Sequence, residues 1–355
     1  MILKAIPAYC SGDFLEGVYK RLDKPLAEYL LDDSEELWIA ELYKFIHGNC
    51  ALIIDLDYNE LLRRSTDKSA RDYNPNFKKL WKNGKIAFIS SPEEFNKMHT
   101  NKEYFKNKTN EIFLTNFPKE FCSGVEKKHG LVCSCNESMD VDIPRLFRFE
   151  IMPLTKKGTI QSWDFLKQNR YPSNSAVIAD NYIFKRKDLL CDNLYAILKN
   201  LLPSELDEEF HLTIFTREVN DLESIWSLVY DSFLKNLPYK VNLSIGKASR
   251  GSLGLHDRDI ITNYCWYHSG AGFTLFQKSD KGTNVLHNTK VFVFPVTHMG
   301  YYLRSEKQEN DREAPAQANY FSALNIFKKI WRDLPDKMGL YKTFVGERRN
   351  RLLDS

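Results

Sequence analysis

Apolar runs and amphipathic stretches alternate along the first part of the chain. An amphipathic helical pattern over residues 24–46 precedes the run CALIIDLDY, which is long enough for a strand and too short for a buried helix. Further strands are predicted at KIAFISS, NEIFLTNF and GLVCSC, and helices at NPNFKKLWKN, from Ser91-Pro92 onward and over residues 118–128. This alternation predicts an α/β fold with a doubly wound, mainly parallel sheet covered by helices on both faces.

The alternation resumes after a polar stretch, NESMDVDIPRLFR, which we take as a domain boundary. Strands are predicted at SAVIADNYIF, HLTIFTRE, YKVNLSIGK and KVFVFPV, and helices at CDNLYAILKNLL, from Asp221 to Leu234 and over residues 318–334. Asn220 and Glu223 have the spacing of a capping box for the second of these helices. Since 355 residues exceed the usual size of one core, we predict two α/β domains, residues 1–140 and 141–355.

Composition and charge narrow the function only slightly. With 43% hydrophobic and 27% charged residues the chain has the profile of a folded protein, and its net charge of +3 neither requires nor excludes a polyanionic partner. There is no apolar run of membrane-spanning length and no pattern of a signal peptide at the start, so we expect a cytoplasmic location. The seven scattered cysteines are expected to be reduced thiols. In HGLVCSC, His129, Cys133 and Cys135 lack a second ligand pair, which favours a buried strand over a metal site.

A glycine-rich segment, SRGSLGLHDRDIITNY, carries the most specific pattern in the sequence. His256-Asp257-Arg258 is followed after four residues by Asn263, and after six more by Gly270-Ala271-Gly272. This register resembles the histidine–lysine–aspartate motif of phospholipase-D-type domains, with arginine in place of lysine and asparagine in place of aspartate. The resemblance covers roughly residues 175–300. The HDR form is similar to the non-catalytic phospholipase-D-like domain that ends certain eukaryotic MIT-domain proteins, and to bacterial relatives of that domain.

The resemblance implies a catalytic role for His256, Arg258 and Asn263. An imidazole at position 256 can attack phosphorus, and the Arg258 guanidinium can neutralise the phosphate oxygens as charge develops. Asn263 keeps the hydrogen-bonding capacity of the family's aspartate without its charge. The turn at Ser269, Gly270 and Gly272 is predicted to bind a phosphate oxygen through backbone N–H groups, and this site requires no cofactor.

Only one half of the two-part phospholipase-D site is present, because neither His211 nor His287 has the required spacing. The chain is therefore predicted either to form a homodimer that brings two copies of His256 together, or to bind phosphate without cleaving it. A purely structural alternative is that His256 caps a turn and Arg258 pairs with Asp257 or Asp259. Our leading hypothesis is recognition of phosphodiesters in nucleic acid, and the resemblance to these domains implies a nuclease-type component of a bacterial defence system. The alternative is a binding module for the anionic headgroups of a membrane or for a partner protein.

The N-terminal region offers two weaker candidates. Asp55 and Asp57 lie on one side of an extended segment and, with Glu60, can hold Mg²⁺; the alternative, which we favour, is that these acids start a helix. A basic stretch can face nucleic acid or form a solvated face over an aromatic core stripe, and we favour the second interpretation. That stretch comprises Lys78, Lys79, Lys82 and Lys85, interleaved with Phe77 and Trp81. The basic segment GERRNR near the end can also contact phosphates.

Overall fold

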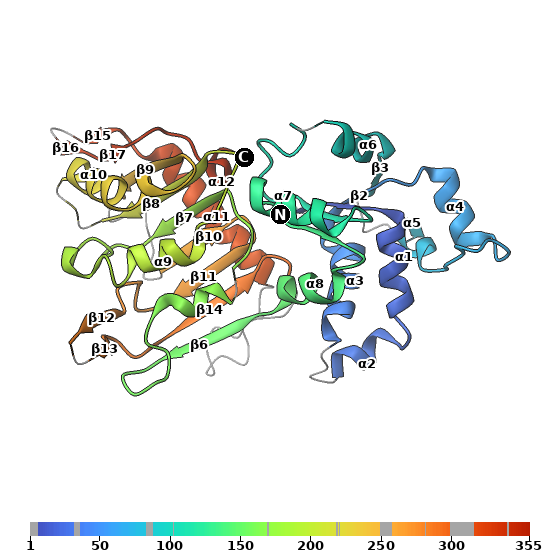
Figure 1. Cartoon of the computed structure of the whole chain (residues 1–355), viewed down its shortest axis with the longest axis horizontal. Coiled ribbons are helices and arrows are strands. Elements are labelled where there is room, and N and C mark those ends of the chain that lie inside the picture. The colour runs from blue at the N-terminus through green and yellow to red at the C-terminus, as the bar shows by residue number, and fades with distance from the viewer. Residues whose placement is uncertain are drawn as a thin grey trace. The chain divides into compact units, whose positions relative to one another are not determined.

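The computed structural model describes residues 6–31, 36–82, 88–101, 103–168, 170–217, 219, 221–248, 258–280, 282–298, 316–338 and 341–355. The fold is mixed α/β, as predicted, and includes a parallel sheet (Figure 1). The chain divides into two compact units, one formed by Met1–Arg148 with Thr297–Gln317 and the other by Phe149–Val296 with Ala318–Ser355. The polar stretch that we took as the boundary forms helix α8 (Met139–Phe147), whose apolar positions Met139, Ile143 and Leu146 are buried in the first unit.

The first unit contains a five-stranded parallel sheet in the order β3-β2-β1-β4-β5. The strands are β1 (Ile6–Cys10), β2 (Cys50–Ile54), β3 (Phe88–Ser90), β4 (Ile112–Thr115) and β5 (Cys133–Cys135). Because the chain moves outward from β1 first to one side and then to the other, the sheet is doubly wound. Four of these strands were predicted, but the central one was not. Pro7 has no N–H for the ladder and argues against a central strand when only the sequence is considered.

Helices connect these strands and cover the sheet. They are α1 (Gly12–Arg21), α2 (Leu26–Leu31), α3 (Leu37–Gly48), α4 (Tyr58–Thr66), α5 (Phe77–Lys82), α6 (Pro92–Thr100) and α7 (Lys119–His129). The single helix predicted over residues 24–46 is two helices, α2 and α3, and α1 was not predicted. It begins directly after β1, where the Ser11 hydroxyl accepts a hydrogen bond from the Phe14 N–H at 3.2 Å.

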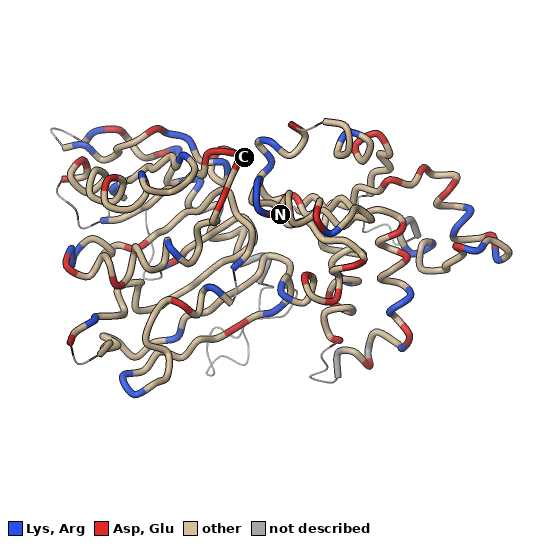
Figure 2. The backbone as a smooth tube through the Cα atoms, in the orientation of Figure 1, with Lys and Arg blue, Asp and Glu red and all other residues tan. Residues whose placement is uncertain are grey.

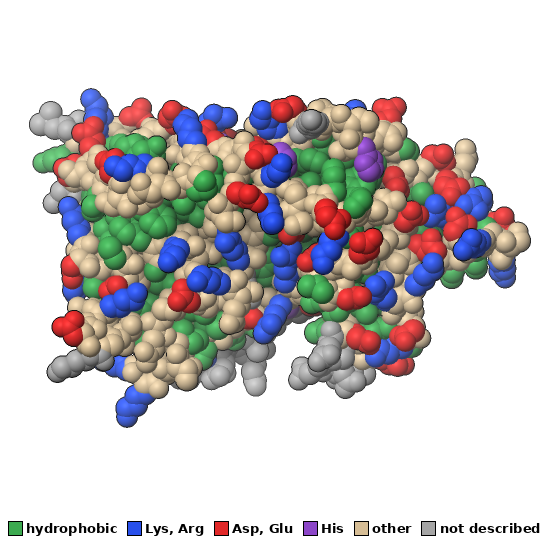
Figure 3. All heavy atoms as spheres, in the orientation of Figure 1, with side chains coloured by type: hydrophobic (Ala, Val, Ile, Leu, Met, Phe, Trp, Pro, Cys, Tyr) green, Lys and Arg blue, Asp and Glu red, His purple; other side chains and the backbone are tan. Residues whose placement is uncertain are grey.

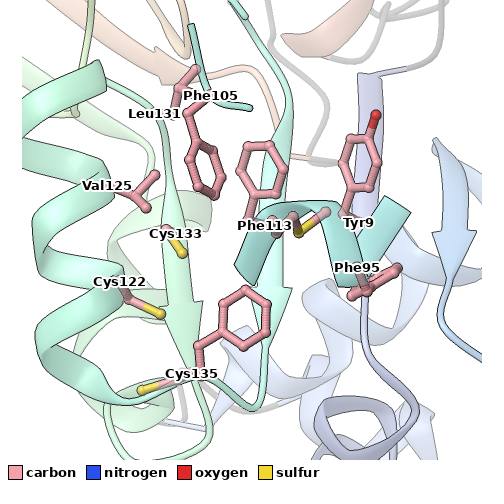
Figure 4. Packing of buried hydrophobic residues seen from close by; sticks show 11 residues of the cluster. Tyr9, Phe95, Phe105, Phe113, Cys122, Val125, Leu131, Cys133 and Cys135 are labelled. Carbon is pink, nitrogen blue, oxygen red and sulfur yellow. The ribbon is translucent and has the colours of Figure 1, made fainter. Parts of the chain in front are cut away.

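An aromatic core lies against β1 and β4 of the first unit (Figure 4). The rings of Tyr9 and Phe113 stack with centroids 5.0 Å apart. The thiols of Cys122, Cys133 and Cys135 belong to the same cluster and are no more than 2% exposed. The buried strand predicted in HGLVCSC is therefore confirmed for Cys133–Cys135, whereas His129 is the last residue of α7.

The second unit is built around an eight-stranded mixed sheet in the order β17-β9-β8-β7-β10-β11-β14-β6. The predicted strands are present as β7 (Ser175–Ala179), β8 (Phe210–Thr216), β9 (Val241–Lys247) and β14 (Thr289–Pro295). The other members are β6 (Glu150–Leu154), β10 (Arg258–Thr262), β11 (Cys265–Ser269) and β17 (Phe344–Val345). Two small hairpins pair β12 (Phe276–Ser279) with β13 (Gly282–Val285) and β15 (Lys337–Met338) with β16 (Tyr341–Lys342). Strands β7, β8 and β9 are parallel, and the remaining pairings of the large sheet are antiparallel.

Helices pack on both faces of this sheet. They are α9 (Leu194–Leu201), α10 (Leu222–Ser232), α11 (Ala316–Asp333) and α12 (Arg351–Asp354), with short 3₁₀ turns η1 (Trp163–Lys167), η2 (Lys187–Leu189) and η3 (Leu234–Asn236). In Figure 1, α9 and α10 lie in front of the parallel strands. Asp221, rather than the predicted Asn220, caps α10 by accepting the Ser224 N–H at 3.1 Å; Asn220 lies outside the described residues. Phe215 of β8 contacts the rings of Phe327 and Trp331 on α11.

The basic segment near the end of the chain bonds to several elements of the second unit. We call residues 348–351 the seam, because they connect β7, β8 and α11. The Asn350 amide donates to Thr213 Oγ1 at 2.9 Å and accepts from the Ser175 hydroxyl at 2.8 Å. Arg351 forms a buried ion pair with Glu208 at 2.7 Å, and the side chains are 9% and 2% exposed. Arg348 donates to two carbonyl groups at the end of α11. Arg348 and Arg351 are thus engaged inside the unit, which does not favour the expectation that this segment contacts phosphates.

His211 gives this seam a dependence on pH. Its ring is 1% exposed, and Nδ1 accepts the Arg351 N–H at 3.1 Å. Burial, reinforced by the charge of Arg351, lowers the pKa of His211 from 6.5 to about 4. Between these values the unfolded chain binds more protons than the folded chain. The stability that the neutral ring contributes is therefore complete above about pH 6.5 and is lost as the pH falls towards 4.

We expect the His211→Asn variant to lose less stability in acid than the parent protein. Asparagine can accept the same N–H through Oδ1 but does not titrate. Urea unfolding at pH values from about 7 to 4.5 should show a smaller fall in unfolding free energy for the variant, by about 1–3 kcal/mol. Identical pH slopes for the two proteins would contradict this assignment.

Candidate anion-binding site

A pocket of about 410 Å³ lies at the edge of the large sheet where β7 ends and β10 begins. The antiparallel register pairs Ala179 with Asp259, which brings Asp180 and Arg258 next to each other across the two strands. Residues from three further segments complete the pocket. The lining residues are Asp180, Tyr182, Lys185, Arg186, Leu189, Arg258, Ala271, Thr274, Leu286 and His287. The pocket therefore combines three permanent cations and a histidine with one carboxylate.

Arg258 is held in a defined orientation at this edge. Its Nη1 donates to the carbonyl oxygen of Gly270 at 2.7 Å, and its guanidinium carbon lies 5.5 Å from the centroid of the Tyr182 ring. It does not pair with Asp259, whose carboxylate instead bonds with Trp266 Nε1 and His268 Nδ1, each at 2.8 Å. The structural alternative that pairs Arg258 with Asp259 is therefore wrong, and Asp257 lies outside the described residues.

Asp180 holds two backbone segments of the pocket in place. It is 3% exposed, and its two carboxylate oxygens accept the backbone N–H groups of Tyr182 at 2.8 Å and Phe273 at 2.7 Å. Burial raises the pKa of Asp180, while these two hydrogen bonds and the charge of Arg258 oppose the rise. Our sequence reasoning missed this residue. A carboxylate directly after an apolar parallel strand is a signal that could have identified it.

Asn193 fixes the same segment from the side of α9. It is 1% exposed, and its Oδ1 accepts the backbone N–H groups of Leu275 at 2.8 Å and Phe276 at 2.9 Å. Its Nδ2 donates to the carbonyl oxygens of Leu189 at 3.0 Å and Phe276 at 2.8 Å. Asp180 and Asn193 together hold the backbone from residue 273 to 276 against the pocket.

The glycine turn between β11 and β12 supports Arg258 in this structure. Ser269 is fully buried, and its hydroxyl donates to the Gly272 carbonyl at 2.8 Å. Gly272 has φ of +87°, and a Cβ there would lie 2.9 Å from Asp180 Oδ2, so both the conformation and the space require glycine. Gly270 offers its carbonyl to Arg258. The buried position of Ser269 does not fit its predicted contact with phosphate. The turn instead aims the guanidinium.

Asn263 lies at the other end of β10 and is fully buried. Its Oδ1 accepts the N–H groups of Asn174 and Ser175, each at 3.0 Å, and its Nδ2 donates to Asn174 Oδ1 at 2.9 Å. A strand rises about 3.3 Å per residue, so Arg258 and Asn263 are roughly 16 Å apart. The structure does not bring them together, and the position of Asn263 fits a structural role. The predicted nucleophile, His256, lies outside the described residues.

The predicted magnesium ligands of the first unit have separate backbone partners. Asp55 accepts the Gly12 N–H at 2.7 Å, and Asp57 caps α4 by accepting the Glu60 N–H at 2.8 Å. Glu60 itself is bonded to Arg63 and Arg64. Within the part of the chain that the structure describes, no three His, Cys, Asp or Glu side chains are grouped to hold a metal ion. The geometry therefore fits our alternative, in which Asp57 starts a helix.

The basic stretch of α5 fits the core-stripe interpretation at the residues whose side chains are described. Phe77 is fully buried and packs edge-on against Tyr19 with centroids 5.1 Å apart. Lys79 lies over the ring of Tyr43 at 5.5 Å, and Lys78 is exposed. Lys85 and the side chains of Trp81 and Lys82 lie outside the described part of the chain.

Comparisons with known proteins assign no family to this chain. No protein-family model matches it, and no curated protein matches its sequence. Among the helices that the structure describes, none has the length and apolar character needed to cross a lipid bilayer. The geometry of the pocket is therefore the basis for inferring what the second unit binds.

We expect Asn263→Ala to destabilise the protein by about 2–4 kcal/mol, because two buried backbone N–H groups lose their acceptor. Anion binding by the folded variant should remain at the parent level, since the Arg258 pocket is at the opposite end of the strand. Asn284→Ala, an exposed site in β13, is the matched control and should leave stability unchanged. Chemical denaturation and an oligonucleotide-binding assay measure the two properties separately. A binding defect without a loss of stability would return Asn263 to the ligand site.

Proposed function

We propose that the second unit binds the phosphodiester backbone of single-stranded nucleic acid at the pocket around Arg258. The observation that carries this proposal is the grouping of cations around one aromatic ring. Lys185 Nζ lies 5.4 Å and the Arg258 guanidinium carbon 5.5 Å from the centroid of Tyr182. Single-stranded nucleic acids are bound by this combination of positive charge, which attracts phosphates, and aromatic surface, on which bases stack.

The guanidinium of Arg258 suits a phosphate ligand. Its planar fork can donate two parallel hydrogen bonds to a tetrahedral oxyanion, and such charge-assisted bonds are stronger than neutral ones. The bond to Gly270 fixes the direction of the fork, which reduces the conformational entropy lost on binding. The Asp180 carboxylate faces the backbone N–H groups of Tyr182 and Phe273, so its negative charge is partly offset where a phosphate would approach.

Tyr182 favours nucleic acid over a phospholipid headgroup as the ligand. The ring is partly exposed in the pocket and can stack with an unpaired base, which a headgroup does not offer. Bases in a duplex are already stacked on one another, so the same feature favours a single strand. In Figure 2, Lys and Arg alternate with Asp and Glu along the described chain. Affinity therefore has to come from this local pocket rather than from one broadly basic face.

The test is fluorescence anisotropy with a labelled single-stranded oligonucleotide at several salt concentrations. We expect Arg258→Gln to weaken binding by about 1.5–3 kcal/mol and to reduce the salt slope by about one phosphate contact. Tyr182→Leu should weaken binding by about 1–3 kcal/mol with little change in the salt slope, because stacking is not ionic. Arg332→Gln, an exposed arginine on α11, is the matched control and should bind like the parent.

Equal affinity in the parent and Arg258→Gln proteins, both folded, would reject the proposal. Capture of the parent by vesicles containing phosphatidylserine, with no binding to the oligonucleotide, would replace nucleic acid by an anionic membrane as the ligand.

Cleavage of the bound strand, as in a nuclease-type component of a bacterial defence system, would need His256 as nucleophile and a second half-site. We propose that any such activity belongs to a two-fold homodimer, because the chain contains one half-motif. Light scattering across a concentration series, with cleavage measured on the same samples, should then show activity rising with the dimer fraction. A monomer with full cleaving activity would contradict this assembly.

A further inference from the structure

A second pocket of the same unit surrounds Arg170 and has a volume of about 520 Å³. It lies where the chain enters the parallel strands, because Arg170 precedes β7, Ser204 precedes β8 and Leu237 precedes β9. The Arg258 pocket lies at the opposite edge, where β7 ends. The two pockets share no lining residue.

Arg170 is a partly buried cation without a countercharge among the described residues. No carboxylate of these residues lies within ion-pair distance of it. Its electrostatic neighbours are the phenols of Tyr239 and Tyr267, which are uncharged at neutral pH, and burial lowers the pKa of Arg170. Arg351 of the same unit, by contrast, pairs with Glu208 at 2.7 Å. Removing a charge from water without a partner is costly, so a bound anion would offset that cost at Arg170.

The walls of the pocket show what kind of anion fits. Lys199, exposed on α9, is a second cation, and no Asp or Glu is among the lining residues. Leu202, Pro203, Phe233 and Leu237 form the apolar part of the wall. Figure 3 shows hydrophobic side chains gathered over this region of α9 and α10. The neighbouring pocket shares Lys199 and Phe233 and adds Lys278, but its two carboxylates, Asp164 and Asp192, offset that positive charge. The anionic group is therefore directed to Arg170.

We propose that the Arg170 pocket binds a small organic anion with an apolar body. Its carboxylate or phosphate head pairs with Arg170 and Lys199, and its body packs against Leu202, Phe233 and Leu237. The volume lies in the range typical of sites for small molecules. A nucleic-acid strand fits this pocket poorly, because its regularly spaced phosphates would fall against apolar walls. The inference is therefore independent of the nucleic-acid site proposed at Arg258.

The test is isothermal titration calorimetry with three probes that share an eight-carbon chain: octanoate, octyl phosphate and octylammonium. Both anions should bind the parent protein, and octylammonium should not. Arg170→Gln should weaken octanoate binding by about tenfold or more, since a charge-assisted hydrogen bond is lost. Lys199→Gln should weaken it by about threefold, as expected for an exposed charge. Arg332→Gln again serves as the matched control and should bind like the parent.

Four further measurements keep the result decisive. Thermal unfolding shows whether Arg170→Gln is folded, and Lys199→Gln, an exposed change, provides the test if it is not. Arg170→Gln should keep its affinity for the oligonucleotide, and Arg258→Gln should keep its affinity for octanoate, so each site can fail without the other. Absence of binding by both anions, binding of octylammonium as tightly as octanoate, or unchanged octanoate affinity in the folded Arg170→Gln or Lys199→Gln variants would overturn the proposal.

Discussion

The arrangement of the candidate site depends on two buried polar side chains. They supply hydrogen-bond partners to a backbone segment that lies outside any β-sheet. Residues 273–275 leave the large sheet after β11 and have not yet entered the β12–β13 hairpin. Buried backbone N–H groups in such a segment need other acceptors, and Asp180 and Asn193 provide them. This fixes the glycine turn, which in turn presents the Gly270 carbonyl to Arg258. An apolar residue at position 180 would leave the buried N–H of Phe273 without its acceptor and loosen the turn that presents Gly270 to the guanidinium.

The large sheet has different chemistry at its two edges. At the edge where β7 ends, partly exposed cations and an aromatic ring surround a pocket. At the edge where β7 begins, buried amides and hydroxyls satisfy one another, with Asn263, Ser175 and Asn350 at the centre. One short strand, β10, connects the two edges. Arg258 is its first residue and lies at the pocket, whereas Asn263 comes directly after its last residue and lies among the buried polar groups. The first edge therefore carries partly exposed charges, and the polar contacts around Asn263 at the second edge tie neighbouring strands together.

The strands and helices with strong periodicity could be predicted from the sequence, and the exceptions have identifiable causes. β1 begins with an isoleucine–proline pair, and β6 is an edge strand containing Pro153. Proline is unfavourable in a central strand such as β1, where tertiary pairing had to override local preference, and it is tolerated at an edge, although it weakens the strand pattern in the sequence. β11 has no apolar–polar alternation, since Cys265, Trp266 and Tyr267 are followed by His268 and Ser269, and His268 bonds to the buried Asp259. The polar stretch 136–148 contains a helix because every third or fourth residue of α8 is buried, a periodicity that its charged residues concealed.

The candidate site was accessible to sequence reasoning only in part. The spacing around Arg258 indicated a phosphate-binding residue, but Asp180 and Tyr182 lie far away in the sequence, and only strand pairing brings them to Arg258. Asn263 was assigned to the same site because residues of one sequence motif were assumed to lie close together in space. Along an extended strand, five residues carry side chains to opposite edges of a sheet. The role of Asp57 could be predicted from local sequence alone, because a carboxylate is favoured at the start of a helix, and Asp57 caps α4.

The seam formed by Asn350 and Arg351 also determines when the second unit can finish folding. Asn350 meets Thr213 across 137 positions of the chain, and Arg351 meets His211 across 140. Contacts this distant in sequence close large loops and form slowly. Until residue 351 has been synthesised, the hydroxyls of Ser175 and Thr213 and the carboxylate of Glu208 lack these partners. A nascent chain that already contains β7, β8 and β9 therefore still has an open polar edge, which closes only when Asn350 and Arg351 reach Thr213 and His211.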